Sequence, residues 1–173
     1  DKVDISKVIQ NDINLTCLRR TKGSLAGARD PKFVFNYPQD LPLIFLCEGP
    51  IQDVFENMFN NAFDAIVLKD KRKIEPNYQG RISIDVAKQD NSIIIRVEDN
   101  GIGIPKESLH KLFTPLFTTK ATSEKGVVGG SGLGLCVMQS FIEDHSGTIS
   151  VESEHTKWTR FTVSLPLEFK PPK

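Results

Sequence analysis

Hydrophobic and polar residues alternate along this chain with two different periods. Near the start, apolar residues recur at helical spacing after Asp4 and Ser6, either of which can cap a helix. Other segments alternate with the period of two that is typical of strands. The pattern predicts four helices, one from Asp4 or Ser6, one from Pro50 to about Leu68, and two over residues 105–113 and 132–145. The predicted strands are residues 32–37, 43–47, 81–87, 92–99, 147–153 and 159–165.

Short connections can join consecutive predicted strands as hairpins. Residues 88–91, for example, are a hairpin-like connection between two alternating segments. Segments rich in turn residues or charges separate the other elements, and we expect residues 21–31, 69–80 and 114–130 to be loops, the last of them mobile. Hairpin-linked strands mixed with helices favour an α+β two-layer sandwich over a doubly wound parallel sheet.

Length and composition are those of one globular domain. The 173 residues suffice for a full-sized core, and the hydrophobic content of 39% and charged content of 25% are ordinary. Lys and Arg balance Asp and Glu at 22 each, so the net charge of zero provides no basic surface for nucleic acid or an anionic membrane. A neutral average still allows a local basic pocket for phosphates.

The cysteines indicate the redox compartment of the protein. Cys17, Cys47 and Cys136 stand alone, so neither a zinc site nor a disulfide framework is indicated, and their odd number suits a reducing cytoplasm. No apolar run has the length of a membrane span, and no signal peptide is evident. Because the chain starts at Asp1 without a methionine, we expect it to be the cytoplasmic part of a longer protein, which is either free or membrane-anchored.

The predicted helix that starts at Pro50 carries an unusual group of asparagines. Asn57, Asn60 and Asn61 lie within five positions, although helix interiors disfavour asparagine because its amide competes for backbone hydrogen bonds. Asn57, Asn61 and Asp64 fall at i, i+4 and i+7 and share one stripe. This stripe is either a solvated polar face or a place where an amide oxygen meets a hard cation. Mg²⁺ takes few protein ligands and keeps waters and phosphates for the rest.

A first glycine-rich segment, DNGIGIP at residues 99–105, directly follows an apolar strand. Gly101 and Gly103 permit positive φ and the close approach of a ligand. Asp99, at the end of the strand, can accept a hydrogen bond from an exocyclic amine such as that of adenine. The alternative is a plain strand-to-helix turn in which Asp99 acts as a cap. The glycines do not form GxGxxG and no βαβ unit follows, so a dinucleotide fingerprint fits poorly.

A second glycine-rich segment, GGSGLGL at residues 129–135, opens a predicted helix, whose free N–H groups and positive dipole end suit phosphate. It lacks the spacing of a Walker-type loop, and the alternative is a flexible hinge. In the preceding LFTPLFTTK, Phe113 and Phe117 could anchor a loop that closes over a nucleotide. Lys120 and Lys125 could reach phosphate oxygens as point charges, or simply be solvated.

In this order, these segments resemble the ATP-binding catalytic domain of two-component sensor histidine kinases, a family grouped with gyrase B, the ninety-kilodalton heat-shock chaperone and MutL. The resemblance runs from about Val3 to Pro166 and includes all four boxes, with the NAxDA and FTTK forms of the nitrogen-sensing kinases. It implies a Bergerat-type fold. This is a two-layer sandwich in which about three helices cover one face of a mixed, mostly antiparallel sheet and a lid closes over ATP.

The resemblance also implies a role for each matching residue. Asn61 would ligate Mg²⁺, Asn57 would lie near the phosphates, and Asp99 would recognise the adenine amino group, with Thr162 lining the adenine pocket. The implied catalytic residues are Asn57, Asn61 and Lys120, and the implied cofactors are ATP and Mg²⁺. The implied ATP-binding residues are Asn57, Asn61, Asp64, Asp99, Gly101, Gly103, Ile104, Phe113, Thr118, Thr119, Lys120, Gly130, Ser131, Gly132, Leu133, Gly134, Leu135 and Thr162.

The chain departs from the family pattern in several places. Asp64 and Ala65 replace a Lys followed by Tyr or His, residues 155–158 replace a Gly-x-Gly turn, and the loop over residues 69–80 is longer than is common. Asn57 stands where the gyrase and chaperone branches carry a glutamate that activates water. An asparagine there fits a kinase that spares ATP from hydrolysis. The neighbouring Glu56 does not occupy the same position, because it lies about 100° away around the helix.

None of His110, His145 and His155 is followed by the acidic residue that usually follows the phosphoacceptor histidine of these kinases. We therefore expect the acceptor to lie upstream. On this interpretation, residues 1–20 are an N-terminal helix or linker from a dimerisation domain, residues 21–166 are the ATP-binding catalytic domain, and residues 167–173 are a tail.

The leading hypothesis is a domain that binds Mg·ATP and donates the γ-phosphate to a histidine on the dimerisation domain of the same protein. The receiver domain of a response regulator would be a further partner. A nucleotide-gated interaction module without phosphotransfer is the alternative, and an ATPase of the gyrase or MutL branch is disfavoured by Asn57. We expect no nucleic-acid partner, and we expect the chain alone to be monomeric because dimerisation in the family lies upstream.

Overall fold

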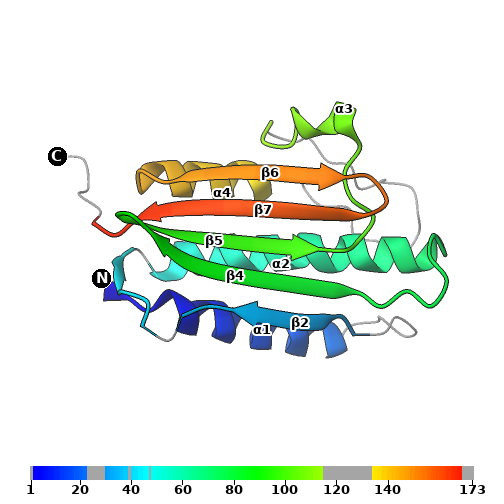
Figure 1. Ribbon diagram of the computed structural model, residues 1–173, viewed down its shortest axis with the longest axis horizontal. Coiled ribbons are helices and arrows are strands. Elements are labelled where there is room, and N and C mark those ends of the chain that lie inside the picture. The colour runs from blue at the N-terminus through cyan, green and yellow to red at the C-terminus, as the bar shows by residue number, and fades with distance from the viewer. Residues whose placement is uncertain (1, 23–29, 39, 47, 115–133, 169–173) are drawn as a thin grey trace.

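The structure, a computed structural model, describes residues 2–22, 30–38, 40–46, 48–114 and 134–168 (Figure 1). Helices and strands are mixed along the chain, as the sequence pattern predicts. In chain order they are β1 (Lys2–Val3), α1 (Ile5–Lys22), β2 (Lys32–Asn36), β3 (Ile44–Phe45), α2 (Glu48–Lys71), β4 (Arg81–Gln89), β5 (Ser92–Asp99), α3 (Lys106–Leu109), α4 (Gly134–Asp144), β6 (Thr148–Glu154) and β7 (Trp158–Pro166).

The main sheet has five strands in the order β2-β4-β5-β7-β6. The β2–β4 pair is parallel, while the β4–β5, β5–β7 and β6–β7 pairs are antiparallel. Strands β1 and β3 form a separate antiparallel pair. A mixed, mostly antiparallel sheet confirms the prediction of an α+β fold.

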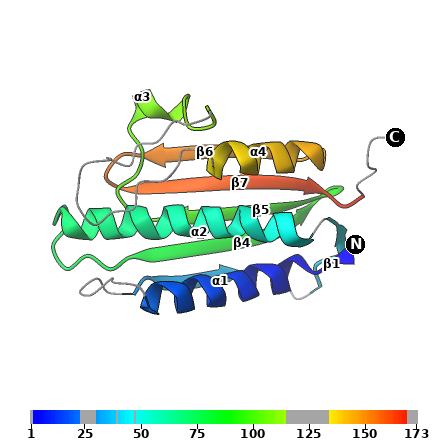
Figure 2. The same cartoon turned by 180° about the vertical axis from the view of Figure 1, so that it is seen from behind.

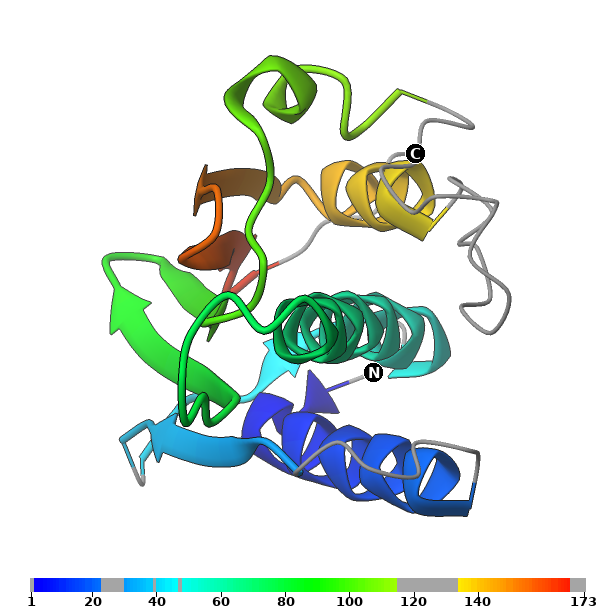
Figure 3. The same ribbon diagram turned by 90° about the vertical axis from the view of Figure 1, so that its right-hand side faces the viewer.

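Helices α1, α2 and α4 cover one face of the sheet and leave the other face open (Figure 2 and Figure 3). Because only one face is covered, buried and partly exposed residues alternate along β4, β5 and β7. The core lies between these strands and the apolar stripe of α2. Its fully buried side chains include Ile51, Phe55, Met58, Phe59, Ile82, Ile84, Ile93, Ile95, Met138 and Ile142.

Helix α1 shares this core and lies beside α2. Its apolar stripe of Val8, Ile9 and Ile13 is buried, with at most 5% of each residue exposed. The helix begins where the sequence pattern places it, and Asp4 is its cap. The Oδ1 atom of Asp4 accepts hydrogen bonds from the backbone N–H groups of Ser6 and Lys7, at 3.1 and 3.3 Å.

Some element boundaries differ from the prediction. Helix α2 continues to Lys71 instead of ending near Leu68, and β1 was not predicted. The charged segment KDKRK looks like a loop in the sequence, yet Lys69 is only 4% exposed and has polar partners in the interior, which explains why the helix continues. Helix α3 is shorter than predicted, and only its Lys106–Leu109 part is α-helical. No helix among the described residues has the length and apolar character needed to cross a membrane.

Candidate ATP-binding site

The first glycine box lies against α2 at the end of β5. Asp99 is 4% exposed, and its Oδ1 atom accepts a hydrogen bond of 2.8 Å from the backbone N–H of Gly101. The N–H of Ile102 donates to the carbonyl of Ala65 on α2, at 3.0 Å. A Cβ atom on Gly101 would lie 2.5 Å from the carbonyl carbon of Ala65, so only glycine allows this close approach of turn and helix.

The second half of the box lies against the hairpin between β6 and β7. Gly103 has a φ of +68°, and a Cβ atom there would collide with the carbonyl oxygen of Glu154. The N–H of Ile104 donates to Ser153 Oγ at 2.8 Å. The N–H of Thr156 donates to the carbonyl of Ile102 at 2.6 Å, so the turn over residues 155–158 also packs against the glycine box. This contact explains why Gly103 is needed, because a side chain there would push the two turns apart.

Burial dominates the electrostatics of Asp99. Burial, with a smaller contribution from the neighbouring carboxylate of Glu98, raises the pKa of this carboxyl to about 7, against the opposing effects of the Gly101 N–H and the positive charge of Lys69. The site therefore places a carboxylate in a nearly dry environment. In such an environment a hydrogen bond to a ligand N–H group is stronger than the same bond in water.

The predicted adenine-pocket residue Thr162 lies on the other face of the sheet from Asp99. It pairs with Arg96 on β5, and these two residues belong to the partly exposed set that faces away from the helices. The β7 residue opposite Asp99 is Thr159, which is 3% exposed. The structure thus does not bring Thr162 to the site. Alternation with the apolar Phe161 could have placed Thr159 on the buried face of β7 from the sequence, but its position opposite Asp99 depends on the strand register.

The start of α4 lies against the asparagine stripe of α2. Asn57 donates from Nδ2 to the carbonyl of Asp53 at 2.9 Å, and a Cβ atom on Gly134 would lie 2.6 Å from Asn57 Oδ1. Asn61 and Asp64 are partly buried on the same stripe, between this contact and the first glycine box. Helix α2 thus contacts both glycine boxes. These contacts are separated by about 12 Å along the helix, at 1.5 Å per residue.

Three further predicted site residues are described by the structure. Ile104, Phe113 and Leu135 are partly buried, and the last two pack against the hydrophobic core. The rest of the predicted phosphate-binding set lies outside the described residues: Thr118, Thr119, Lys120, Gly130, Ser131, Gly132 and Leu133. Within the described part of the chain, no group of three His, Cys, Asp or Glu residues could hold a metal ion.

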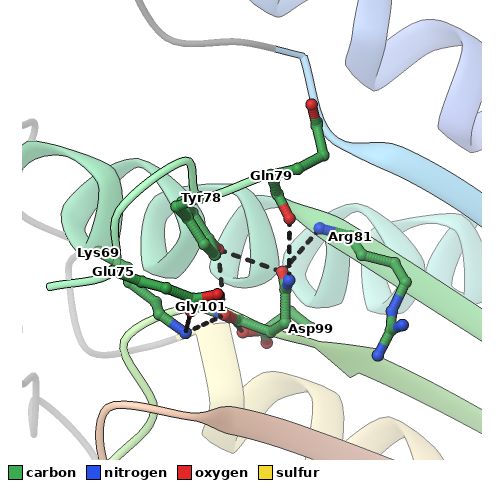
Figure 4. Close-up of polar contacts among 8 residues, drawn as sticks. Lys69, Glu75, Tyr78, Gln79, Arg81, Asp99 and Gly101 are labelled. Carbon is green, nitrogen blue, oxygen red and sulfur yellow. Dashed lines mark hydrogen bonds and ion pairs between the residues drawn. The ribbon is translucent and has the colours of Figure 1, made fainter. Parts of the chain in front are cut away.

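Asn100, within the first glycine box, was missed by the sequence reasoning. Its side chain accepts from the N–H of Arg81 at 2.7 Å and donates to the carbonyl of Gln79 at 3.0 Å. The backbone carbonyl of Asn100 accepts a hydrogen bond from Lys69 Nζ at 3.1 Å and another from the Tyr78 hydroxyl at 3.0 Å. Figure 4 shows Lys69, Glu75 and Tyr78 close to the turn that carries Asp99 and Gly101. An asparagine inside a tight turn is the signal that could have indicated such a role.

This arrangement has two chemically different ends. At one end, a buried carboxylate and a glycine that comes close to α2 can accept an amine and pack against a flat ring. At the other end, the amide oxygen of Asn57 faces Gly134, the first residue of α4, and free N–H groups at a helix start favour anions. An elongated ligand with a polar ring and an anionic tail matches both ends.

Comparison with known proteins agrees with this geometry. The family described as "Histidine kinase-, DNA gyrase B-, and HSP90-like ATPase" matches residues 48–169. The sensor histidine kinase ZraS of Escherichia coli (strain K12) is 32% identical over 165 residues, which cover 95% of this chain and 30% of that protein. Sporulation kinase E of Bacillus subtilis (strain 168) is 35% identical over 128 residues, covering 74% of this chain and 15% of that kinase.

Solved structures share the fold. The catalytic domain of the histidine kinase ThkA has a TM-score of 0.73 at 23% identity, covering 96% of this chain and 95% of that one. Full-length ShkA in complex with AMPPNP has a TM-score of 0.74 at 18% identity, covering 99% of this chain and 32% of that one. At these identities the likeness shows the fold alone.

The chain therefore belongs to the histidine kinase-, DNA gyrase B- and HSP90-like ATPase family and corresponds to the ATP-binding catalytic domain of a sensor histidine kinase. This confirms the resemblance drawn from the glycine boxes and the asparagine helix. The chain spans about a third of the length of ZraS.

Proposed function

We propose that this domain binds Mg·ATP along α2 and presents the γ-phosphate to a histidine on a separate dimerisation domain of the same protein. The observation that carries the proposal is that one helix contacts both glycine boxes. Ala65 meets Gly101 and Asn57 meets Gly134, so a single rigid element sets the distance between the base and the phosphates.

The adenine end is assigned to the buried carboxylate of Asp99. Its ionised form accepts a hydrogen bond from the exocyclic amine of adenine, whereas guanine presents a carbonyl oxygen at the corresponding position. Two acceptors facing each other would repel, and this repulsion provides the selectivity. Thr159, buried opposite Asp99 in the strand register, is a candidate second pocket residue.

The phosphate end is assigned to the stripe of Asn57 and Asn61 and to the start of α4. Amide oxygens are hard ligands that suit Mg²⁺, and the contact of Asn57 with Gly134 leaves space only because residue 134 has no side chain. Asn61 would hold the ion, which supplies positive charge against the phosphate oxygens. Lys120 and the second glycine box are assigned to the same phosphates on the family resemblance.

The transfer step needs little covalent chemistry from the protein. The bond between the γ-phosphorus and its bridging oxygen breaks, a bond from a histidine nitrogen to that phosphorus forms, and ADP leaves. The domain contributes positioning and charge stabilisation. Asn57 is not a base, so water is not activated and the chain alone should hydrolyse ATP only slowly.

The test combines this chain with its separately produced dimerisation domain and ATP labelled in the γ-phosphate. Acid-labile label on a histidine of the dimerisation domain, and its passage to a receiver domain, would support the proposal. Tight ATP binding without any label on the partner would instead favour a nucleotide-gated interaction module. Rapid steady hydrolysis by the chain alone would contradict the kinase assignment. A phosphoacceptor His→Gln variant of the dimerisation domain is the matched control.

A further inference from the structure

We propose that Lys69 is a positioning residue for the nucleotide, which holds the turn carrying Asp99 and Gly101 against α2 through the carbonyl of Asn100. This inference rests on the proposed function, because it concerns the same adenine end. Lys69 follows the predicted end of α2, in a segment that the sequence pattern describes as a charged loop.

The geometry of Lys69 is that of a buried hub. Its side chain is 5% exposed, and its Nζ atom lies 3.1 Å from the carbonyl oxygen of Asn100 and 3.1 Å from Glu75 Oε2. The ammonium also lies 4.8 Å from the centre of the Tyr78 ring. Three groups of different chemistry, a carbonyl, a carboxylate and an aromatic face, therefore converge on one cation (Figure 4).

Two of these partners come from the segment between α2 and β4. Glu75 and Tyr78 both lie in this segment. Its last residue is Gly80, which packs so closely against Ile66 of α2 that a side chain at position 80 would collide with it. The long connection thus folds back over the end of α2. It supplies a second donor, the Tyr78 hydroxyl, to the same carbonyl that Lys69 holds.

Stability alone does not require a positive charge at this position. Removing an ammonium from water is unfavourable, and an apolar side chain of similar size at a buried position is often no less stabilising. The charge does have a consequence for the site, because Lys69 lies close enough to Asp99 to lower the pKa of that carboxyl. Lys69 therefore acts on the adenine end twice, through the position of the turn and through the ionisation of the acceptor.

Other charged groups around Asp99 act differently. Glu98, its neighbour on β5, raises the pKa of Asp99. Burial raises the pKa of Tyr78 well above its usual range, and Asp99, Glu75 and Asp70 raise it further, so the hydroxyl keeps its proton and remains a donor. Among the groups that shift Asp99, Lys69 is the one cation that the described residues provide.

The experiment measures the affinity of this chain for Mg·ATP by calorimetry between about pH 6 and about pH 9, a range chosen to bracket the pKa of Asp99. The variants are Lys69→Met and, as the matched control, Lys71→Met, which changes an exposed lysine at the end of the same helix. For Lys69→Met we expect about a tenfold loss of affinity at the alkaline end, the loss expected from one misplaced hydrogen bond to a charged group. We also expect the affinity to begin falling at a higher pH than in the parent, because the carboxyl has lost its nearby cation.

The outcomes separate the two proposals. If the parent binds no ATP, the proposed function is wrong and this inference falls with it. If the parent and Lys71→Met bind alike while Lys69→Met shows the same affinity and the same pH profile, only the role of Lys69 is wrong. A merely structural role would lower affinity without moving the pH profile, and would also overturn the inference.

A second variant keeps the test decisive if Lys69→Met does not fold. Tyr78→Phe removes one donor to the Asn100 carbonyl and leaves the cation in place. Severalfold weaker binding at an unchanged melting temperature supports the positioning role of this network, whereas unchanged affinity, or weaker binding that accompanies a lower melting temperature, contradicts it. Thermal melts of both variants, compared with Lys71→Met, establish which of them are folded.

Discussion

Replacing the buried carboxylate at the adenine end should separate binding from stability. Asp99→Asn keeps the size of the side chain and an oxygen that can accept from the Gly101 N–H. It removes the charge, and it presents an amide N–H group in addition to an oxygen. We therefore expect ATP affinity to fall while the folded protein becomes more stable at neutral and alkaline pH.

The magnitude follows from the pKa of Asp99, which is about 7 in the folded chain against an ordinary value of 3.8. Since the folded pKa is the higher one, the folded state binds more protons than the unfolded state between these values, and stability decreases as pH rises through this range. Each pH unit in this window is worth about 1.4 kcal/mol, so the ionised carboxyl destabilises the fold by about 4 kcal/mol above pH 7.

The assay is urea unfolding of the nucleotide-free parent and of Asp99→Asn at about pH 5 and about pH 8. The free energy of unfolding of the variant minus that of the parent should be larger at about pH 8 than at about pH 5, by about 2 to 3 kcal/mol. Asp144→Asn, at an exposed position in α4, is the control for the loss of one negative charge. The change with pH is the reliable signal, because new hydrogen bonds of the Asn side chain affect both pH values equally. A difference that is the same at both pH values would refute the reasoning, and unchanged ATP affinity would refute the adenine assignment.

Three further substitutions test other contacts. Asn61→Ala should remove most of the Mg²⁺-dependence of ATP binding in calorimetry. Asn60→Ala, which lies off the stripe, should keep this dependence. If ATP binding by the parent does not depend on Mg²⁺, the metal assignment is wrong. Gly134→Ala should weaken ATP binding about tenfold because its Cβ would lie 2.6 Å from Asn57 Oδ1, while Gly49→Ala, with no atom within 4 Å, should bind as the parent does. Gly103→Ala should lower the free energy of unfolding by about 1 to 3 kcal/mol, since alanine is strained at a φ of +68° and collides with Glu154, and an unchanged urea midpoint would contradict this.

The sequence predicted the fold best where local and long-range requirements agree. Alternating apolar residues in β5 and β7 specify both a strand and a buried face, so these strands were located to within a few residues. Glycines with a steric reason were also recognisable, because Gly101 and Gly103 occur in a motif whose turn needs them. The asparagine stripe was found because asparagine is costly within a helix and the spacing put Asn57, Asn61 and Asp64 on one side.

Prediction failed where a residue's role depends on a partner distant in sequence. Lys69 looks like part of a solvated charged loop until α2 is seen to pack beside the turn at Asn100, thirty-one residues further along. Thr162 was predicted for the adenine pocket, but the register between β5 and β7, which the sequence alone does not give, puts Thr159 opposite Asp99. In both cases the missing information was tertiary pairing, which propensity and periodicity do not contain.

The buried carboxylate links these observations energetically. At neutral pH, Asp99 lowers the stability of the nucleotide-free fold, and an adenine amine would restore a partner to the ionised group. Binding should therefore stabilise the protein more above pH 7 than below it, since ligand stabilisation depends on the affinity for the folded state alone. Lys69 and Asn100 hold the turn in place before the ligand arrives, so less of the binding energy is used to order it. This explains why a fold would keep two buried charges, Lys69 and Asp99, close to each other at the end of one helix and one strand.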